Sequence, residues 1–217
     1  MTPATASPET ICDRASKRGE PTWEMARFYP TQGTWTEAEY LALNTNQLIE
    51  FSDGCLEFLP MPTPFHQRIV AFLYALLNAF VRARLPGEVF FAPCRIATIA
   101  EKYREPDIFY ARPERVIDSH QPIKGADLLM EVVSGDPEDR KRDLEEKRAE
   151  YEQARIPEYW IVDPQERTIT VLFLDGNNYR VHGVFGVGSR ATSALLTGFA
   201  VSVDEVFAAG EGKLPNS

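Results

Sequence analysis

The N-terminal third of the chain alternates between helical and strand-like hydrophobic patterns. Residues 34–44 are predicted to form a short helix, with Thr34 or Thr36 as its N-cap. Residues 47–59 follow, in which Asp53-Gly54 separates two alternating runs. An Asp-Gly pair in this position predicts a β-hairpin. The chain is therefore expected to enter its core through an N-terminal helix and a hairpin.

The middle of the chain combines a long helical pattern with strand patterns. Between residues 65 and 84 the apolar positions recur at spacings of three and four, which predicts an amphipathic helix; they are Ile69, Phe72, Leu73, Leu76, Leu77 and Phe80. Pro86-Gly87 ends this helix. Short strands are predicted at 88–93, 94–99 and 106–110. The mainly apolar run at 127–134 is typical of a strand that is buried on both faces.

The remaining pattern predicts a charged helix over 136–155 and strands at 158–163, 167–174 and 178–187. Helices and strands thus follow one another in mixed order, without an internal repeat. This order favours a mixed α/β (α+β) domain, in which a central sheet is flanked by a long helix on each side.

The two ends of the chain lack periodic apolar positions. Residues 1–27 are rich in Thr, Pro, Ser and charge and are expected to be a disordered tail. Residues 28–207 should form a single domain, and residues 208–217 a frayed tail. The N-terminus has no apolar signal-peptide core, and the most apolar stretch, 72–81, is shorter than the roughly 20 residues of a membrane span. A cytoplasmic protein is expected.

Composition adds limits to this picture. The 217 residues are 44% hydrophobic and 25% charged, as in an ordinary globular protein. The three cysteines are far apart, which excludes a disulfide framework and a CxxC zinc cluster and fits a reducing compartment. The net charge of −9 counts against broad, nonspecific affinity for nucleic acids. A nuclease stays possible, because a bound cation neutralises clustered carboxylates.

Glu131 interrupts the apolar strand at 127–134. Side chains alternate along a strand, so Leu129, Glu131 and Val133 share one face, and Glu131 is the one charge on either face. A buried carboxylate needs a cation, a partner or a raised pKa. A structural ion pair or a solvent-exposed strand end would also explain it. The residues around it favour a metal-binding or catalytic role.

Asp107 and Lys147 are the two residues that suggest this role. Asp107 lies at the start of an apolar strand, although a lone Pro-Asp pair usually marks only a turn. Lys147 shares a helical stripe with Leu144 and Tyr151, which should face the sheet and direct the lysine inward or along the seam. The alternatives are a lysine that extends its amine into water or a surface pair with Asp143.

Together these three residues form a specific combination: an Asp at a strand start, a Glu within the next strand and a Lys on the following helix. Two carboxylates and a backbone carbonyl can hold Mg²⁺ or Mn²⁺. Such a metal activates a water molecule and neutralises charge on a phosphate, and a nearby lysine can assist the attacking water.

The motifs around these residues resemble those of a known family. Pro106-Asp107, Asp127-Leu128-Leu129-Met130-Glu131-Val132-Val133, Glu146-Lys147-Arg148-Ala149-Glu150-Tyr151 and Ile156-Pro157-Glu158-Tyr159-Trp160-Ile161-Val162-Asp163 are similar to those of the Uma-two family of restriction endonucleases. That family belongs to the PD-(D/E)XK nuclease superfamily. Upstream, Ile49-Glu50, Asp53-Gly54 and Phe65-His66 match its pattern as well. The resemblance covers about residues 34–187.

This resemblance implies a restriction-endonuclease-like fold with a metal site at Asp107, Glu131 and the backbone carbonyl of Val132. In the wider superfamily the catalytic lysine lies two residues after the glutamate, where this chain has Val133. The family pattern implies that the lysine has moved to Lys147. Glu50 and His66 also match: Glu50 is either a third acidic ligand or a hairpin surface residue. His66 either faces the metal or phosphate or is a surface residue without a catalytic task.

Three functions fit these features. The first is a Mg²⁺- or Mn²⁺-dependent endonuclease that cleaves DNA, with a homodimer expected for cleavage of both strands. The second is a noncatalytic nucleic-acid-binding or interaction module that keeps the nuclease fold, which the acidic charge and the absent strand lysine favour. The third is a metal-dependent hydrolase of another phosphate ester.

Overall fold

A six-stranded mixed sheet forms the centre of the computed structural model, which describes residues 29–43, 47–133, 140 and 142–213. Its strands run in the order β11, β10, β9, β8, β6, β3. Only β8 and β9 are parallel neighbours within this sheet; the other pairs are antiparallel. The strands are β3 (Glu88–Phe91), β6 (Ile108–Ala111), β8 (Leu128–Val132), β9 (Glu158–Asp163), β10 (Thr168–Asp175) and β11 (Asn178–Phe185).

A smaller five-stranded sheet lies beside it, in the order β2, β1, β5, β4, β7. Its strands are β1 (Ile49–Ser52), β2 (Cys55–Phe58), β4 (Ile96–Ala97), β5 (Lys102–Arg104) and β7 (Ile123–Lys124). The predicted hairpin is β1–β2, and its turn residues Asp53 and Gly54 both have positive φ. From β5 the chain passes into β6 through Glu105, Pro106 and Asp107, so these three residues join the two sheets.

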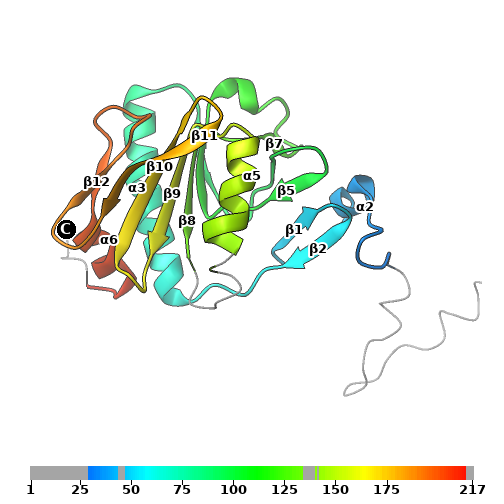
Figure 1. Ribbon diagram of the computed structural model, residues 1–217, viewed down its shortest axis with the longest axis horizontal. Coiled ribbons are helices and arrows are strands. Elements are labelled where there is room, and N and C mark those ends of the chain that lie inside the picture. The colour runs from blue at the N-terminus through cyan, green and yellow to red at the C-terminus, as the bar shows by residue number, and fades with distance from the viewer. Residues whose placement is uncertain (1–28, 44–46, 134–139, 141, 214–217) are drawn as a thin grey trace, which may run out of the picture.

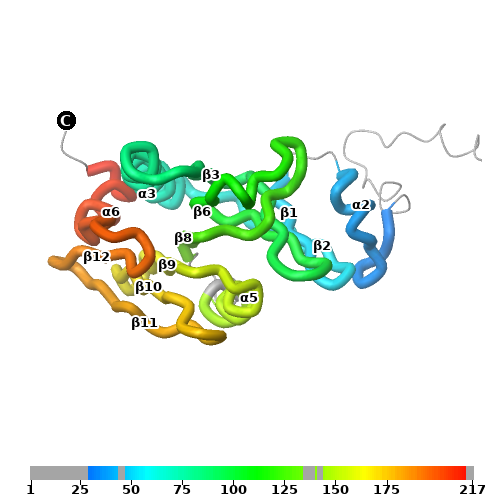
Figure 2. The backbone as a smooth tube through the Cα atoms, turned by 90° about the horizontal axis from the view of Figure 1, so that it is seen from above, coloured from blue at the N-terminus to red at the C-terminus, as the bar shows by residue number. Residues whose placement is uncertain are grey.

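Helices cover both faces of the large sheet. Helix α3 (Pro64–Arg84) and helix α6 (Val203–Gly210) lie on one face, and α5 (Lys147–Gln153) lies on the other (Figures 1 and 2). The predicted core positions Ile69, Leu73 and Leu77 of α3 are fully buried. A short helix, α2 (Glu37–Leu41), adjoins the small sheet; Thr36 caps it and forms a capping box with Glu39.

The two faces of β8 belong to two separate cores. Leu128, Met130 and Val132 pack with α3 in one core, and Leu129 and Val133 pack with Tyr151 of α5 in the other. The prediction of a strand buried on both faces is therefore confirmed. It also follows that Glu131, which alternates with Leu129 and Val133, faces α5.

Several predicted boundaries differ from the structure. The strand expected at 94–99 is reduced to β4, and four strands of two or three residues were not predicted: β5, β7, β12 (Arg190–Thr192) and β13 (Ala200–Ser202). Such short strands carry too few residues for a period to be recognised. Helix α6 runs to Gly210, whose buried position corrects the tail expected from residue 208.

The predicted helix at 136–155 appears as a π-helical turn, η3 (Arg142–Glu146), followed by α5, while most of its first turn lies outside the described residues. The tail expected at 1–27 also lies outside them. A one-turn helix, η2 (Pro113–Arg115), follows β6. In the part of the chain that the structure describes, no helix has the length and apolar character that crossing a membrane requires.

Val171→Ala should test the core between α3 and the sheet. Val171 in β10 is fully buried, and Val184 in the adjacent strand β11 is 63% exposed. The buried substitution should lower the free energy of unfolding by roughly 2–3 kcal/mol, since two methyl groups leave a packed core. Val184→Ala, the matched control, should change it by less than about 0.5 kcal/mol. If urea denaturation showed the same loss of unfolding free energy for both variants, this assignment of the core would be contradicted.

Candidate active site

Asp107 and Glu131 meet at one end of the β6–β8 pair. Asp107 immediately precedes β6, and its Oδ2 accepts a hydrogen bond from the backbone N–H of Val132 at 2.8 Å. The backbone N–H of Asp107 in turn lies 3.4 Å from Oε2 of Glu131. Glu131 is 4% exposed. The antiparallel pairing of the two strands thus brings the two acidic residues next to each other, in contact through the intervening backbone.

Helix α5 supplies two side chains to Glu131. Lys147 Nζ lies 3.0 Å from Glu131 Oε1, and the Tyr151 hydroxyl donates to the same oxygen at 2.9 Å. Lys147 is only 3% exposed, so it neither extends into water nor forms a surface pair. Burial raises the pKa of the Tyr151 hydroxyl well above its ordinary value, and the charge of Glu131 adds to this shift. Tyr151 therefore keeps its proton and acts as a donor.

Glu50 lies in the same network. It belongs to β1 but is fully buried, which excludes the interpretation as a hairpin surface residue. Its Oε1 lies 3.5 Å from Lys147 Nζ and accepts the backbone N–H of Glu105 at 3.0 Å. Its Oε2 lies 3.1 Å from Nη1 of Arg104. Lys147 thus lies between two buried carboxylates, one from each sheet.

Arg104 links the small sheet to α5. It is buried at the end of β5, where Nη2 contacts Glu150 Oε2 at 2.6 Å and Nη1 contacts Glu57 Oε2 at 2.9 Å. Glu150 lies three residues after Lys147 on the same face of the helix. Arg104 therefore holds the helix that carries Lys147 against the sheet that carries Glu50.

His66 contacts the site from the first turn of α3, where Thr63 is the N-cap. Its Nε2 lies 3.1 Å from Asp107 Oδ2. Burial alone would lower the pKa of His66, but the hydrogen bond to Asp107 and the charges of Asp107 and Glu131 raise it above its ordinary value. His66 is thus a half-buried partner of Asp107 and not an isolated surface residue.

The donor set suits a small, hard cation. The hydrogen bonds that Asp107 makes to described residues through its carboxylate all fall on Oδ2, so Oδ1 is available to a ligand. Five carboxylates of the network, from Glu50, Glu57, Asp107, Glu131 and Glu150, accompany two fixed cations, Arg104 and Lys147. Among the described residues no group of three His, Cys, Asp or Glu side chains is arranged as a metal cage. Mg²⁺ commonly binds through only one or two carboxylates and completes its shell with water and substrate phosphate.

Sequence reasoning identified Asp107, Glu131, Lys147, Glu50 and His66, and the structure brings all five into one network. It missed Arg104, Glu150 and the hydroxyl of Tyr151. The helical spacing could have pointed to Glu150 and Tyr151, because they follow Lys147 by three and four residues and so lie on the same helix face. Arg104 gave no such signal, because its partners are distant in the sequence.

Lys147→Met should destabilise the fold, because it leaves Glu131 and Glu50 buried without their shared ammonium. We expect the free energy of unfolding to fall by roughly 3–5 kcal/mol in urea denaturation. Adding Glu131→Gln to this variant should recover part of the loss, with a coupling energy of roughly 0.5–3 kcal/mol. The exposed Lys124→Met is the matched control and should change stability little. A Lys147→Met protein as stable as this control would contradict the buried ion pair.

Comparisons with known proteins identify the fold and the family of this chain. Among solved structures, the chain resembles a crystal structure described as a "putative nuclease belonging to DUF820" from Anabaena variabilis ATCC 29413, with a TM-score of 0.65 and 19% sequence identity over 80% of this chain and 97% of that one. At this identity the likeness shows the shared fold. No curated protein matches the chain. The model of the Uma2 family, described as "Putative restriction endonuclease", matches residues 35–204, a segment that includes every residue of the network described above. The chain therefore belongs to the Uma2 family of restriction-endonuclease-like proteins.

Proposed function

We propose that this protein is a Mg²⁺- or Mn²⁺-dependent endonuclease that hydrolyses phosphodiester bonds in DNA. The observation that carries the proposal is the contact of Lys147 with Glu131 beside Asp107, three residues that come from three separate elements. Even when the charges are paired, desolvating a lysine and two carboxylates offsets much of their attraction, so stability alone does not account for such an arrangement and it points to use in chemistry. Membership in the nuclease-like family supports the same reaction class.

The carboxylates of Asp107 and Glu131 and the backbone carbonyl of Val132 would hold the cation. When bound, the cation would neutralise charge on the scissile phosphate and lower the pKa of an attacking water. The remaining residues fix these ligands. His66 orients Asp107 through Oδ2, and Tyr151 holds Oε1 of Glu131 at 2.9 Å.

Lys147 would act on the substrate directly. Its ammonium group lies beside Glu131 and has three N–H donors, so it can donate a hydrogen bond to the attacking water or to a phosphate oxygen. Its positive charge would stabilise the negative charge that develops on the phosphate. Glu50, 3.5 Å from this nitrogen, is the second carboxylate that pairs with the amine, and Arg104 holds Glu50 in place.

A noncatalytic nucleic-acid-binding module is the second candidate. One feature favours it: Val133 stands at the position where the wider superfamily is expected to have its lysine. A module without catalysis would bind nucleic acid but leave it intact in any metal. Hydrolysis of another phosphate ester would instead spare DNA and require a small substrate.

Asp107→Asn and Lys147→Met should test the proposed reaction through cleavage of supercoiled plasmid in Mg²⁺ or Mn²⁺. The parent protein should convert the plasmid to nicked or linear DNA, and chelation of the metal should stop cleavage. We expect Lys147→Met to slow cleavage by about 10²–10³, as for loss of one charge partner of a transition state. Asp107→Asn should reduce it at least as much and should also weaken metal binding, measured by calorimetry.

The matched controls are the variants Lys124→Met and Asp175→Asn, which change exposed residues and should cleave the plasmid like the parent protein. Circular dichroism establishes that each variant is folded before its rate is compared; Asp107→Asn, at a partly exposed side chain, is the safer variant in this respect. Parent-like rates in Lys147→Met would remove this lysine from the mechanism. Absence of cleavage by the folded parent would favour the binding module.

A further inference from the structure

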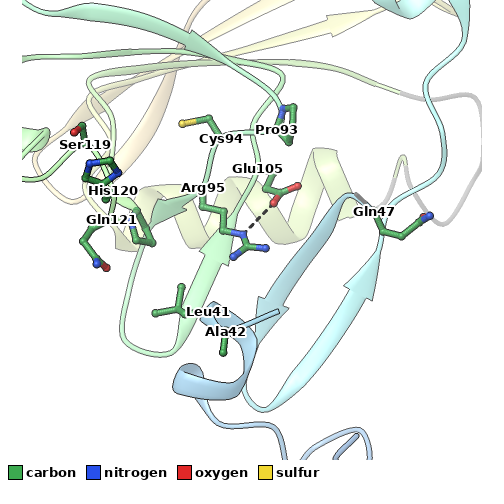
Figure 3. Close-up of a pocket in the computed structure, with 11 residues that line it drawn as sticks. Leu41, Ala42, Gln47, Pro93, Cys94, Arg95, Glu105, Ser119, His120 and Gln121 are labelled. Carbon is green, nitrogen blue, oxygen red and sulfur yellow. Dashed lines mark hydrogen bonds and ion pairs between the residues drawn. The ribbon is translucent and has the colours of Figure 1, made fainter. Parts of the chain in front are cut away.

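A cavity of about 650 Å³ lies on the small-sheet side of the candidate active site. Leu41 and Ala42 at the end of α2 form one wall, and the loop from Ser119 to Pro122 forms another (Figure 3). Arg95 and Glu105 lie between these walls, and Figure 3 shows the contact between them. The volume falls within the roughly 300–1,000 Å³ typical of small-molecule sites.

Glu105 is the feature of this cavity that lacks an explanation within the fold. It is 6% exposed, and its Oε1 accepts a hydrogen bond from Arg95 Nε at 3.2 Å. Its Oε2 is buried and has no donor within hydrogen-bond distance in the described parts of the chain. Burial raises the pKa of the carboxyl group, against the smaller, opposite effect of the backbone N–H of Ile49, which interacts with it. A buried acceptor without a donor is costly, and native proteins seldom keep one without a use. The carboxylate is therefore an acceptor that awaits a donor from a ligand.

Arg95 supplies the complementary donors. Its guanidinium lies over the ring of Tyr40, with 4.5 Å from Cζ to the ring centroid, which fixes its plane. Only Nε is hydrogen-bonded to a described residue, so both terminal nitrogens can donate to a ligand. Because the charges of Arg95 and Glu105 cancel, the pair does not attract an anion strongly. It offers donors and an acceptor side by side to a neutral molecule.

We propose that this cavity binds a single unstacked nucleobase of the nucleic-acid substrate. A base edge carries a donor beside an acceptor, which matches Glu105 Oε2 and the terminal nitrogens of Arg95. The apolar side chains of Leu41, Pro93 and Pro122 line the cavity and can cover the faces of the ring. The choice of a nucleobase, among neutral ligands with such an edge, rests on the proposed function.

The position of Glu105 connects this cavity to the cleavage site. Glu105 lies two residues before Asp107 on the segment that joins the sheets, and its backbone N–H donates to Glu50 of the network. In extended chain, two residues span roughly 7 Å, about the spacing of neighbouring nucleotides in a stretched strand. A base held here would belong to a nucleotide close to the scissile phosphate, so the cavity would set a base preference next to the cut.

The direct test is binding of the four deoxynucleosides, one at a time, measured by calorimetry on the full chain in the presence of EDTA. At least one deoxynucleoside should bind saturably. Glu105→Gln, which weakens the acceptor, and Ala42→Trp, which places a large ring at the rim, should each weaken binding by about tenfold or more. Ala75→Trp, at an exposed position of α3, is the matched control and should bind like the parent.

Three results would overturn the proposal: no saturable binding by any deoxynucleoside, parent-like binding by the folded Ala42→Trp protein, or binding of inorganic phosphate in place of the nucleosides. The assay requires no cleavage, so its outcome is separate from that of the plasmid assay. Nucleoside binding without plasmid cleavage would refute the nuclease proposal and keep the base site. Plasmid cleavage without nucleoside binding would refute the base site and keep the nuclease proposal.

Discussion

The ion pair between Lys147 and two buried carboxylates is the interaction on which the rest of the site depends. Glu131 and Glu50 lie on different sheets, and a single ammonium from α5 approaches both, at 3.0 and 3.5 Å. Without it, two carboxylates would be left in a region closed to water, where the desolvation of each costs several kcal/mol. Arg104 forms a second bridge of this kind, because its guanidinium contacts both Glu50 and Glu150. The two sheets and α5 are thereby joined by charge as well as by apolar packing.

This coupling explains why the site lies where the sheets meet. The segment Glu105-Pro106-Asp107 leaves the small sheet and enters the large one, and it carries both a proposed metal ligand and an acceptor of the neighbouring cavity. The backbone of a residue in the middle of either sheet is occupied by hydrogen bonds to the neighbouring strands, and its side chain is surrounded by side chains of the same sheet. A residue at the crossing can be reached from β1, β8 and α3 together, as the contacts of Asp107 and its neighbours show. Chemistry that needs several elements is built most readily at such a junction.

The sequence predicted the long helices, the hairpin and the buried strand because each has a period that repeats over enough residues to be recognised. The same reasoning identified Glu131, since a charge inside an apolar strand is conspicuous. It could not predict β5 or β7, which are two or three residues long and exist only through their partners. For the same reason Arg104 escaped notice: its carboxylate partners Glu50 and Glu150 lie 54 and 46 residues away in the chain. Lys147 was identified from its helical stripe with Leu144 and Tyr151 and from the family resemblance. The stripe left open whether the lysine points inward or into water, and the packing of α5 shows that it is buried.

The location of the lysine on a helix has a consequence for how the site can be controlled. Val133 occupies the strand position two residues after Glu131, and it is buried in the core beneath α5 together with Tyr151. An apolar side chain there packs the helix onto the sheet, and the helix then delivers Lys147 to the space that a strand lysine would otherwise reach. The position of Lys147 is therefore set by the packing of α5, whereas a lysine on the strand would be fixed by the sheet itself. A π-helical turn, η3, immediately precedes Lys147, and π turns are irregular and less stable than α-helix. The packing of α5 through Val133, Tyr151 and the Arg104–Glu150 contact thus brings Lys147 to Glu131.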